Sequence, residues 1–156
     1  MRVRVIAVGT RMPAWVRSGC DEYLTRLKHG LAVALTEIEP AVRGASGTAQ
    51  QAVTTEGRRL LGALGPSDYV IVLDERGREL TTRELADWLA TRMQQGDDLA
   101  FLIGGPDGLA AEVLARSNFT LALSRLTLPH ALARVLLAEQ LYRAHSILGN
   151  HPYHRA

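Results

Sequence analysis

A seven-residue apolar run, DYVIVLD at residues 68–74, limits the folds that are open to this chain. The run is nearly continuous in apolar residues and has the length of a strand rather than a helix. Such a run is typical of a strand that is buried on both faces, as in a parallel sheet covered by helices. We therefore interpret it as a central strand.

Strand-like and helix-like segments alternate along the rest of the chain. β-prone runs predict strands over 2–8, 31–38, 100–103 and 119–123. Apolar residues at helical spacing predict helices over 12–28, 49–64, 81–94, 109–116 and 131–148. The helix over 81–94 opens with TTRE, which matches a capping box. This alternation, without repeats or a linker, predicts a single α/β domain over residues 1–156 with a mainly parallel sheet and helices on both faces.

The composition is that of an ordinary globular chain. The chain has 156 residues, of which 47% are hydrophobic and 22% are charged. A chain of this length buries about two-thirds of its unfolded surface when it folds. No apolar stretch reaches the roughly 20 residues of a membrane span, and the strand-like start lacks the pattern of a signal peptide. Cys20 is the only cysteine, so no intrachain disulfide can form. We expect a cytoplasmic protein without membrane contact.

The formal net charge of +2 is too small to indicate nucleic-acid binding through a basic patch. Of the 18 basic residues only Lys28 is lysine, and arginine dominance fits phosphate recognition and genomic base composition equally well. One arginine lies in the Gly-, Pro- and Ser-rich segment 39–48, which we expect to be an exposed loop. This residue, Arg43, is either a phosphate contact or a solvated loop arginine.

Three loops follow predicted strands and should meet at the carboxyl edge of the sheet. They begin at Leu73-Asp74, at the GGPDG of 104–108 and at the SRLTLP of 124–129. Ligands of open α/β sheets bind at this edge; glycines allow close backbone approach, and the leucines and Pro129 could hold a flat heterocycle. Plain connections are the alternative, since every residue of GGPDG is turn-prone. No G-x-G-x-x-G or P-loop occurs, which disfavours a phosphate-cradling nucleotide site.

The last predicted helix is apolar on more than one face, which indicates burial on more than one side and favours a two-fold dimer. Within it, Arg143 follows Glu139 by four residues and either forms a surface pair or faces a ligand.

The tail, NHPYHR at 150–155, contains an aromatic ring, imidazoles and an arginine, which can stack on bases and meet phosphates. Pro152 between the histidines, with no Asp, Glu or Cys nearby, disfavours a metal site. A frayed terminus is the remaining alternative.

Motifs over the whole chain resemble one family. They are LIGGPDGL at 102–109, LTLPHALARVLLAEQLYRA at 126–144 and the NHPYHR tail, together with RVIAVGTRMPAWV at 4–16 and VLD at 72–74. In these motifs the chain is similar to the bacterial large-subunit ribosomal RNA pseudouridine N3-methyltransferases of the SPOUT superfamily. The resemblance implies a homodimeric SPOUT-type α/β fold with a C-terminal trefoil knot, where S-adenosylmethionine binds.

The resemblance also implies site residues. The cofactor-binding positions are Leu73, Gly104, Gly105, Ser124, Arg125, Leu126, Thr127, Leu128 and Pro129, with Arg125 acting through its backbone. The catalytic candidates are Arg143, Tyr153, His154 and Arg155. Arg155 would stabilise the negative charge that develops on N3, His154 would accept or relay the proton, and Tyr153 would stack on the nucleotide. No metal is needed, because the sulfonium methyl is already electrophilic.

These expectations combine into a predicted function: S-adenosylmethionine-dependent methylation of N3 of a pseudouridine in 23S rRNA, on the assembled ribosome. An assembled substrate fits the weak net charge, because shape can supply recognition that a basic patch does not. The alternative is a catalytically silent, dimeric ribosome- or RNA-binding factor that does not bind the cofactor. Another α/β transferase or nucleotide-binding protein is weakened by the missing phosphate loops.

Overall fold

Five strands form one parallel sheet in the computed structural model, which describes residues 1–44 and 47–155. They are β1 (Val3–Val8), β2 (Val33–Ile38), β3 (Tyr69–Glu79), β4 (Leu99–Ile103) and β5 (Phe119–Ala122). The strand order is β2-β1-β4-β3-β5, and every neighbouring pair of these strands is parallel. The predicted α/β class with a mainly parallel sheet is confirmed. The trefoil knot implied by the resemblance stays a prediction.

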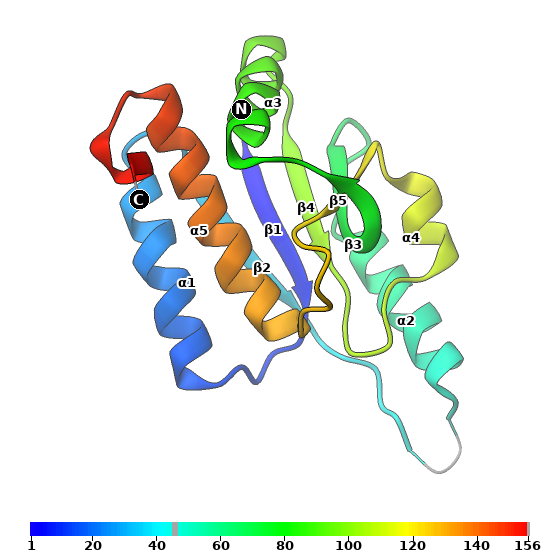
Figure 1. The fold of residues 1–156 in the computed structure, drawn as a ribbon. Helices are drawn as coiled ribbons and strands as arrows, with labels where there is room; N and C mark the ends of the chain where they lie inside the picture. Colours follow the sequence, from blue (N-terminus) through cyan, green and yellow to red (C-terminus); the bar gives the residue numbers. More distant parts are fainter. Residues whose placement is uncertain (45–46, 156) are drawn as a thin grey trace.

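Helices cover both faces of the sheet (Figure 1). Helices α1 (Ala14–Leu27), α3 (Thr82–Gln95) and α5 (His130–Leu148) pack on one face, and α2 (Ala49–Gly62) and α4 (Ala111–Arg116) pack on the other. Side chains of the central strands alternate between the two layers, because successive residues of a strand point to opposite faces. In β4, for example, Phe101 belongs to the first layer and Leu102 to the second.

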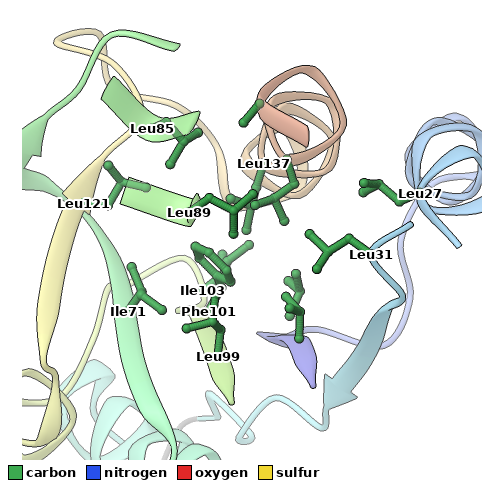
Figure 2. Close-up of a cluster of buried hydrophobic side chains, with 14 of the residues drawn as sticks. Leu27, Leu31, Ile71, Leu85, Leu89, Leu99, Phe101, Ile103, Leu121 and Leu137 are labelled. Carbon is green, nitrogen blue, oxygen red and sulfur yellow. The ribbon is translucent and has the colours of Figure 1, made fainter. Parts of the chain in front are cut away.

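The larger core lies beneath α5. Its side chains Leu137 and Leu141 are fully buried, in one cluster with Leu89 of α3 and Phe101 of β4. Figure 2 shows Leu137 pointing from α5 towards the strand residues of this cluster. The sheet therefore holds the first half of α5, and the loop before it, in a defined position.

Predicted element boundaries agree with the structure to within two residues, except at β3. The capping box is confirmed: the Thr81 hydroxyl accepts the Glu84 N–H at 3.1 Å, and the Glu84 carboxylate accepts the Thr81 N–H at 3.4 Å. The described residues of the predicted 39–48 loop lie outside helices and strands, and Ala45 and Ser46 lie outside the described residues.

The predicted end of β3 at residue 74 was wrong. The strand continues to Glu79, and Leu73 and Arg78 both align with Leu121 of β5, so the register shifts across the intervening residues 74–77, which form a protrusion within β3. Gly77 makes this possible, since a Cβ there would lie 2.8 Å from the backbone C and O atoms of Thr120. The residues of the protrusion thus project at the carboxyl edge of the sheet, while β3 stays paired with β5.

We expect Gly77→Ala to lower the free energy of unfolding by about 1–3 kcal/mol, because the added methyl group meets backbone atoms that cannot rotate away. Gly62→Ala is the matched control. No atom lies within 4 Å of its added Cβ, and alanine in a helix is favoured by up to about 1 kcal/mol. Urea unfolding of both proteins measures the difference, and equal stabilities would contradict the close approach of Gly77 to β5.

Candidate active site

Three loops enclose a cavity of about 790 Å³ at the carboxyl edge of β3, β4 and β5. These strands are neighbours in the sheet, so the β3 protrusion and the loops that follow β4 and β5 lie side by side. The lining residues come from 73–76, 103–109 and 123–130, with Ala133 of α5. The volume is in the range of small-molecule and cofactor sites. The structure thus brings together the three loops that the sequence placed at one edge.

Hydrogen bonds tie these loops to one another and shape their turns. The Thr127 hydroxyl donates to the Glu75 carboxylate at 2.8 Å, which joins the last loop to the β3 protrusion. The Ser124 hydroxyl accepts the N–H of Leu126 at 2.9 Å. Gly105 and Gly108 form an isolated antiparallel bridge, and Gly108 has a φ of +86°, a conformation that favours glycine. One hydrogen bond between side chains therefore joins two of the three cavity segments, and local turns shape the last loop and the glycine loop.

Eight of the nine predicted cofactor positions line this cavity, namely Leu73, Gly104, Gly105, Ser124, Leu126, Thr127, Leu128 and Pro129. The exception is Arg125, whose side chain is 87% exposed and lies 3.9 Å from Glu79. Sequence reasoning missed Glu75, Asp107 and His130, which also line the cavity. Asp107 lies within the predicted glycine loop, and Glu75 and His130 directly follow the other two loop segments, so their place in or next to these loops was the only signal.

The charge of the cavity lining is mainly negative. Among the residues that the structure describes, the lining contains the carboxylates of Asp74, Glu75 and Asp107 but only one arginine, Arg76. Hydrogen bonds from Arg76 lower the pKa of Asp74, so this carboxylate is ionised at neutral pH. Burial lowers the pKa of His130, followed by the effect of Arg134, so its ring is neutral near pH 7. The cavity is thus suited to a ligand that carries positive charge.

The tail forms a short 3-10 helix, η1 (Pro152–Arg155), against the second half of α5. The Tyr153 ring stacks on Tyr142 with centroids 4.5 Å apart, and the Arg143 guanidinium lies 4.8 Å from its centroid. The Tyr153 hydroxyl donates to Glu139 at 3.2 Å, and burial, followed by hydrogen bonding to Tyr23 and the nearby Glu139 carboxylate, raises the pKa of Tyr153 to about 12. A neutral, hydrogen-bonded Tyr153 therefore anchors the tail.

The remaining candidate catalytic residues surround this anchor. Arg143 donates through Nε to Glu139 at 2.8 Å, so the pair predicted at i,i+4 is formed, and the same guanidinium contacts the tail. His154 is half-buried, and its Nδ1 is enclosed without a hydrogen-bond partner among the described residues. Arg155 is exposed. The tail, packed on α5, therefore carries the His154 imidazole and the Arg155 guanidinium.

Tail and cavity lie towards opposite ends of α5, as Figure 1 shows. His130 lines the cavity, whereas Arg143, which contacts the tail, follows thirteen residues later, about 20 Å along a helix that rises about 1.5 Å per residue. Within one chain, the structure therefore does not bring the candidate catalytic residues to the loops.

The whole chain matches proteins that are already classified. The family described as "Predicted SPOUT methyltransferase" matches residues 1–154. The chain belongs to the SPOUT methyltransferase family. It is 51% identical to "Ribosomal RNA large subunit methyltransferase H" of Xanthomonas campestris pv. campestris and 49% identical to the protein of that name from Burkholderia mallei. Both comparisons cover 100% of this chain and of the relative.

Solved structures share the fold of this methyltransferase at low sequence identity. A probable methyltransferase from Bordetella pertussis Tohama I superposes with a TM-score of 0.58 at 19% identity, covering 92% of this chain and 95% of that one. A probable methylase family protein from Haemophilus influenzae gives a TM-score of 0.55 at 17% identity, with 97% and 69% covered. These similarities support the SPOUT fold.

Arg43 of the methyltransferase is ion-paired and is not the freely solvated arginine that was one of the two sequence-based interpretations. Its guanidinium binds the carboxylates of Glu56 and Asp107, because the loop folds back onto α2 and the glycine loop. Over residues 1–44 and 47–155, no three His, Cys, Asp or Glu side chains gather where they could hold a metal ion. No helix in the same residues is long and apolar enough to cross a membrane.

Proposed function

We propose that this methyltransferase uses S-adenosylmethionine to methylate N3 of a pseudouridine in large-subunit ribosomal RNA, on the assembled ribosome in the cytoplasm. The observation on which this rests is the single cavity formed by the β3 protrusion and the loops after β4 and β5. Full-length relatives at 49–51% identity, named as ribosomal RNA large subunit methyltransferases, support the choice of substrate.

The residues of the cavity fit the chemistry of S-adenosylmethionine. Apolar side chains, among them Leu73, Leu126 and Leu128, can enclose an adenine ring, and Leu126 stands 74% exposed at the cavity, where it could cover one. The carboxylates Asp74 and Glu75 suit the positive charges of the sulfonium and the ammonium group. Backbone groups of the turns around the cavity could recognise the edge of the base.

We propose that a second copy of the chain supplies the tail. Helices α1 and α5 lie side by side and leave Trp15, 57% exposed, and half-buried Leu132 and Leu136 at the surface. Such an apolar surface suits an isologous two-fold contact. A dimer through this surface could place the tail of one subunit at the cavity of the other, which the length of α5 prevents within one chain.

The chain's own groups would then act on the acceptor base. S-adenosylmethionine, when bound, supplies an electrophilic methyl group, so the protein must align the base and manage its N3 proton. Arg155 stabilises the negative charge that develops on the imide as N3–H ionises, and His154 accepts the proton. Tyr153 anchors the tail on Tyr142, and Arg143, held by Glu139, adds positive charge beside it.

Transfer of a labelled methyl group tests the proposal. We expect label in a pseudouridine of ribosomes that lack the modification, little label in free 23S rRNA, and none in ribosomes that are already methylated. Cofactor binding without label in any of these substrates would exclude this substrate. Absence of both binding and label would favour a catalytically silent ribosome- or RNA-binding factor.

A further inference from the structure

A buried carboxylate lies behind the glycine loop of residues 104–108. Glu56 of α2 is 2% exposed. It accepts hydrogen bonds from the Ala41 N–H at 3.1 Å and from Arg43 through Nη1 at 2.8 Å and Nη2 at 3.1 Å. An unpaired charge at this depth is strongly unfavourable, so the bidentate pair with Arg43 is required wherever Glu56 stays ionised.

The same guanidinium extends to the cavity wall. Its Nε donates to the Asp107 carboxylate at 2.7 Å, and Nη1 also donates to the Ala41 carbonyl at 3.2 Å. The Arg43 side chain is only 27% exposed, and all three of its guanidinium nitrogens donate hydrogen bonds. Because Glu56 fixes the plane of the guanidinium, the direction in which Nε donates to Asp107 is fixed as well.

The glycine loop also packs closely against Glu56 itself. A Cβ on Gly105 would lie 3.2 Å from Oε1 of Glu56 and 3.2 Å from Cγ1 of Val8, so glycine permits the close approach. The loop therefore packs against Glu56 at Gly105 and is hydrogen-bonded to Arg43 at Asp107. Both loop residues line the cavity.

We propose that Arg43, Glu56 and Asp107 form a clamp that holds the glycine loop in the conformation that binds the methyl donor. Arg43 and Glu56 are positioning residues, since they act through the loop. The proposal rests on the proposed function in one respect, that the cavity is the S-adenosylmethionine site. Its physical basis is preorganisation: a loop that is already ordered loses less conformational entropy when the ligand binds.

Asp107→Asn is the sharpest variant, because it removes one charge-assisted bond and leaves the buried Glu56–Arg43 pair intact. We expect the Kd for S-adenosylmethionine, measured by isothermal titration calorimetry on the full chain, to rise roughly tenfold. Asp107→Glu keeps the carboxylate and should restore most of the affinity. The combined Arg43→Gln and Asp107→Asn protein should bind no more weakly than Arg43→Gln alone, because the two groups share one interaction.

The matched control is Asp97→Asn. Asp97 is another aspartate that pairs with an arginine, Arg92, and it lies near the amino end of β4, away from the cavity. The Asp97→Asn protein should bind the cofactor like the parent. Parent affinity in Asp107→Asn, equal loss in the control, or failure of Asp107→Glu to restore binding would each overturn the clamp. Lack of binding by the parent protein would instead overturn the proposed function and the clamp together, so the two failures are distinguishable.

Discussion

The Arg155→Ala protein is expected to lose methyl transfer to ribosomes by about a hundredfold or more while binding S-adenosylmethionine as the parent does. Removal of one group that stabilises developing negative charge typically lowers kcat by about 10²–10³. Arg155 is exposed, so its replacement leaves the core intact. It also lies in η1, which packs on α5 and does not line the cavity of its own chain, so the local cofactor site should be unaffected.

Single-turnover methyl transfer and calorimetric titration with the cofactor together measure this division of roles. Arg58→Ala provides the matched control, since Arg58 is another exposed arginine and lies on α2, on the opposite face of the sheet from α5. It should retain full methyl transfer. A parallel loss of cofactor affinity and turnover in Arg155→Ala would show that the tail contributes to cofactor binding instead.

Mixed dimers give the second large effect. Gly104→Val should abolish cofactor binding, because even its Cβ would lie 2.8 Å from the Gly108 carbonyl oxygen and force the glycine loop out of shape. Each of the two inactive proteins retains what the other lacks: Arg155→Ala has an intact cavity, and Gly104→Val has an intact tail. If the tail acts on the cavity of the partner, each heterodimer contains one complete site.

Co-refolding equal amounts of the two proteins should therefore restore roughly a quarter of the parent activity, since half of the dimers are mixed and each has one of two sites complete. Each variant refolded alone is the control and should stay inactive. Native mass spectrometry measures the proportion of heterodimer. Heterodimers without activity would mean that the tail acts within its own chain, and the proposed arrangement of subunits would then be wrong.

Local patterns in the sequence were sufficient for most of the fold. The apolar run at 68–74, the helical spacing of apolar residues and the TTRE capping box each depend on interactions between near neighbours. They predicted the elements to within two residues outside β3, and they placed three loops at the carboxyl ends of strands. Those loops line one cavity because β4, β3 and β5 are neighbours in the sheet.

Other features depend on contacts between residues far apart in the chain, which local patterns cannot encode. β3 continues beyond Asp74 because β5 lies beside it and Gly77 leaves room for the Thr120 backbone. Arg43 reads as an exposed loop arginine until tertiary folding brings it to Asp107, which lies 64 residues away in the sequence. The sequence indicated that the tail could contact RNA but not where it lies, and its position at the remote end of α5 follows from stacking on Tyr142 and the hydrogen bond to Glu139. Short-range periodicity in the sequence thus determined which segments form helices and which form strands. Long-range packing decided the contacts of Arg43 with Glu56 and Asp107, the docking of the tail and the separation of the tail from the cavity.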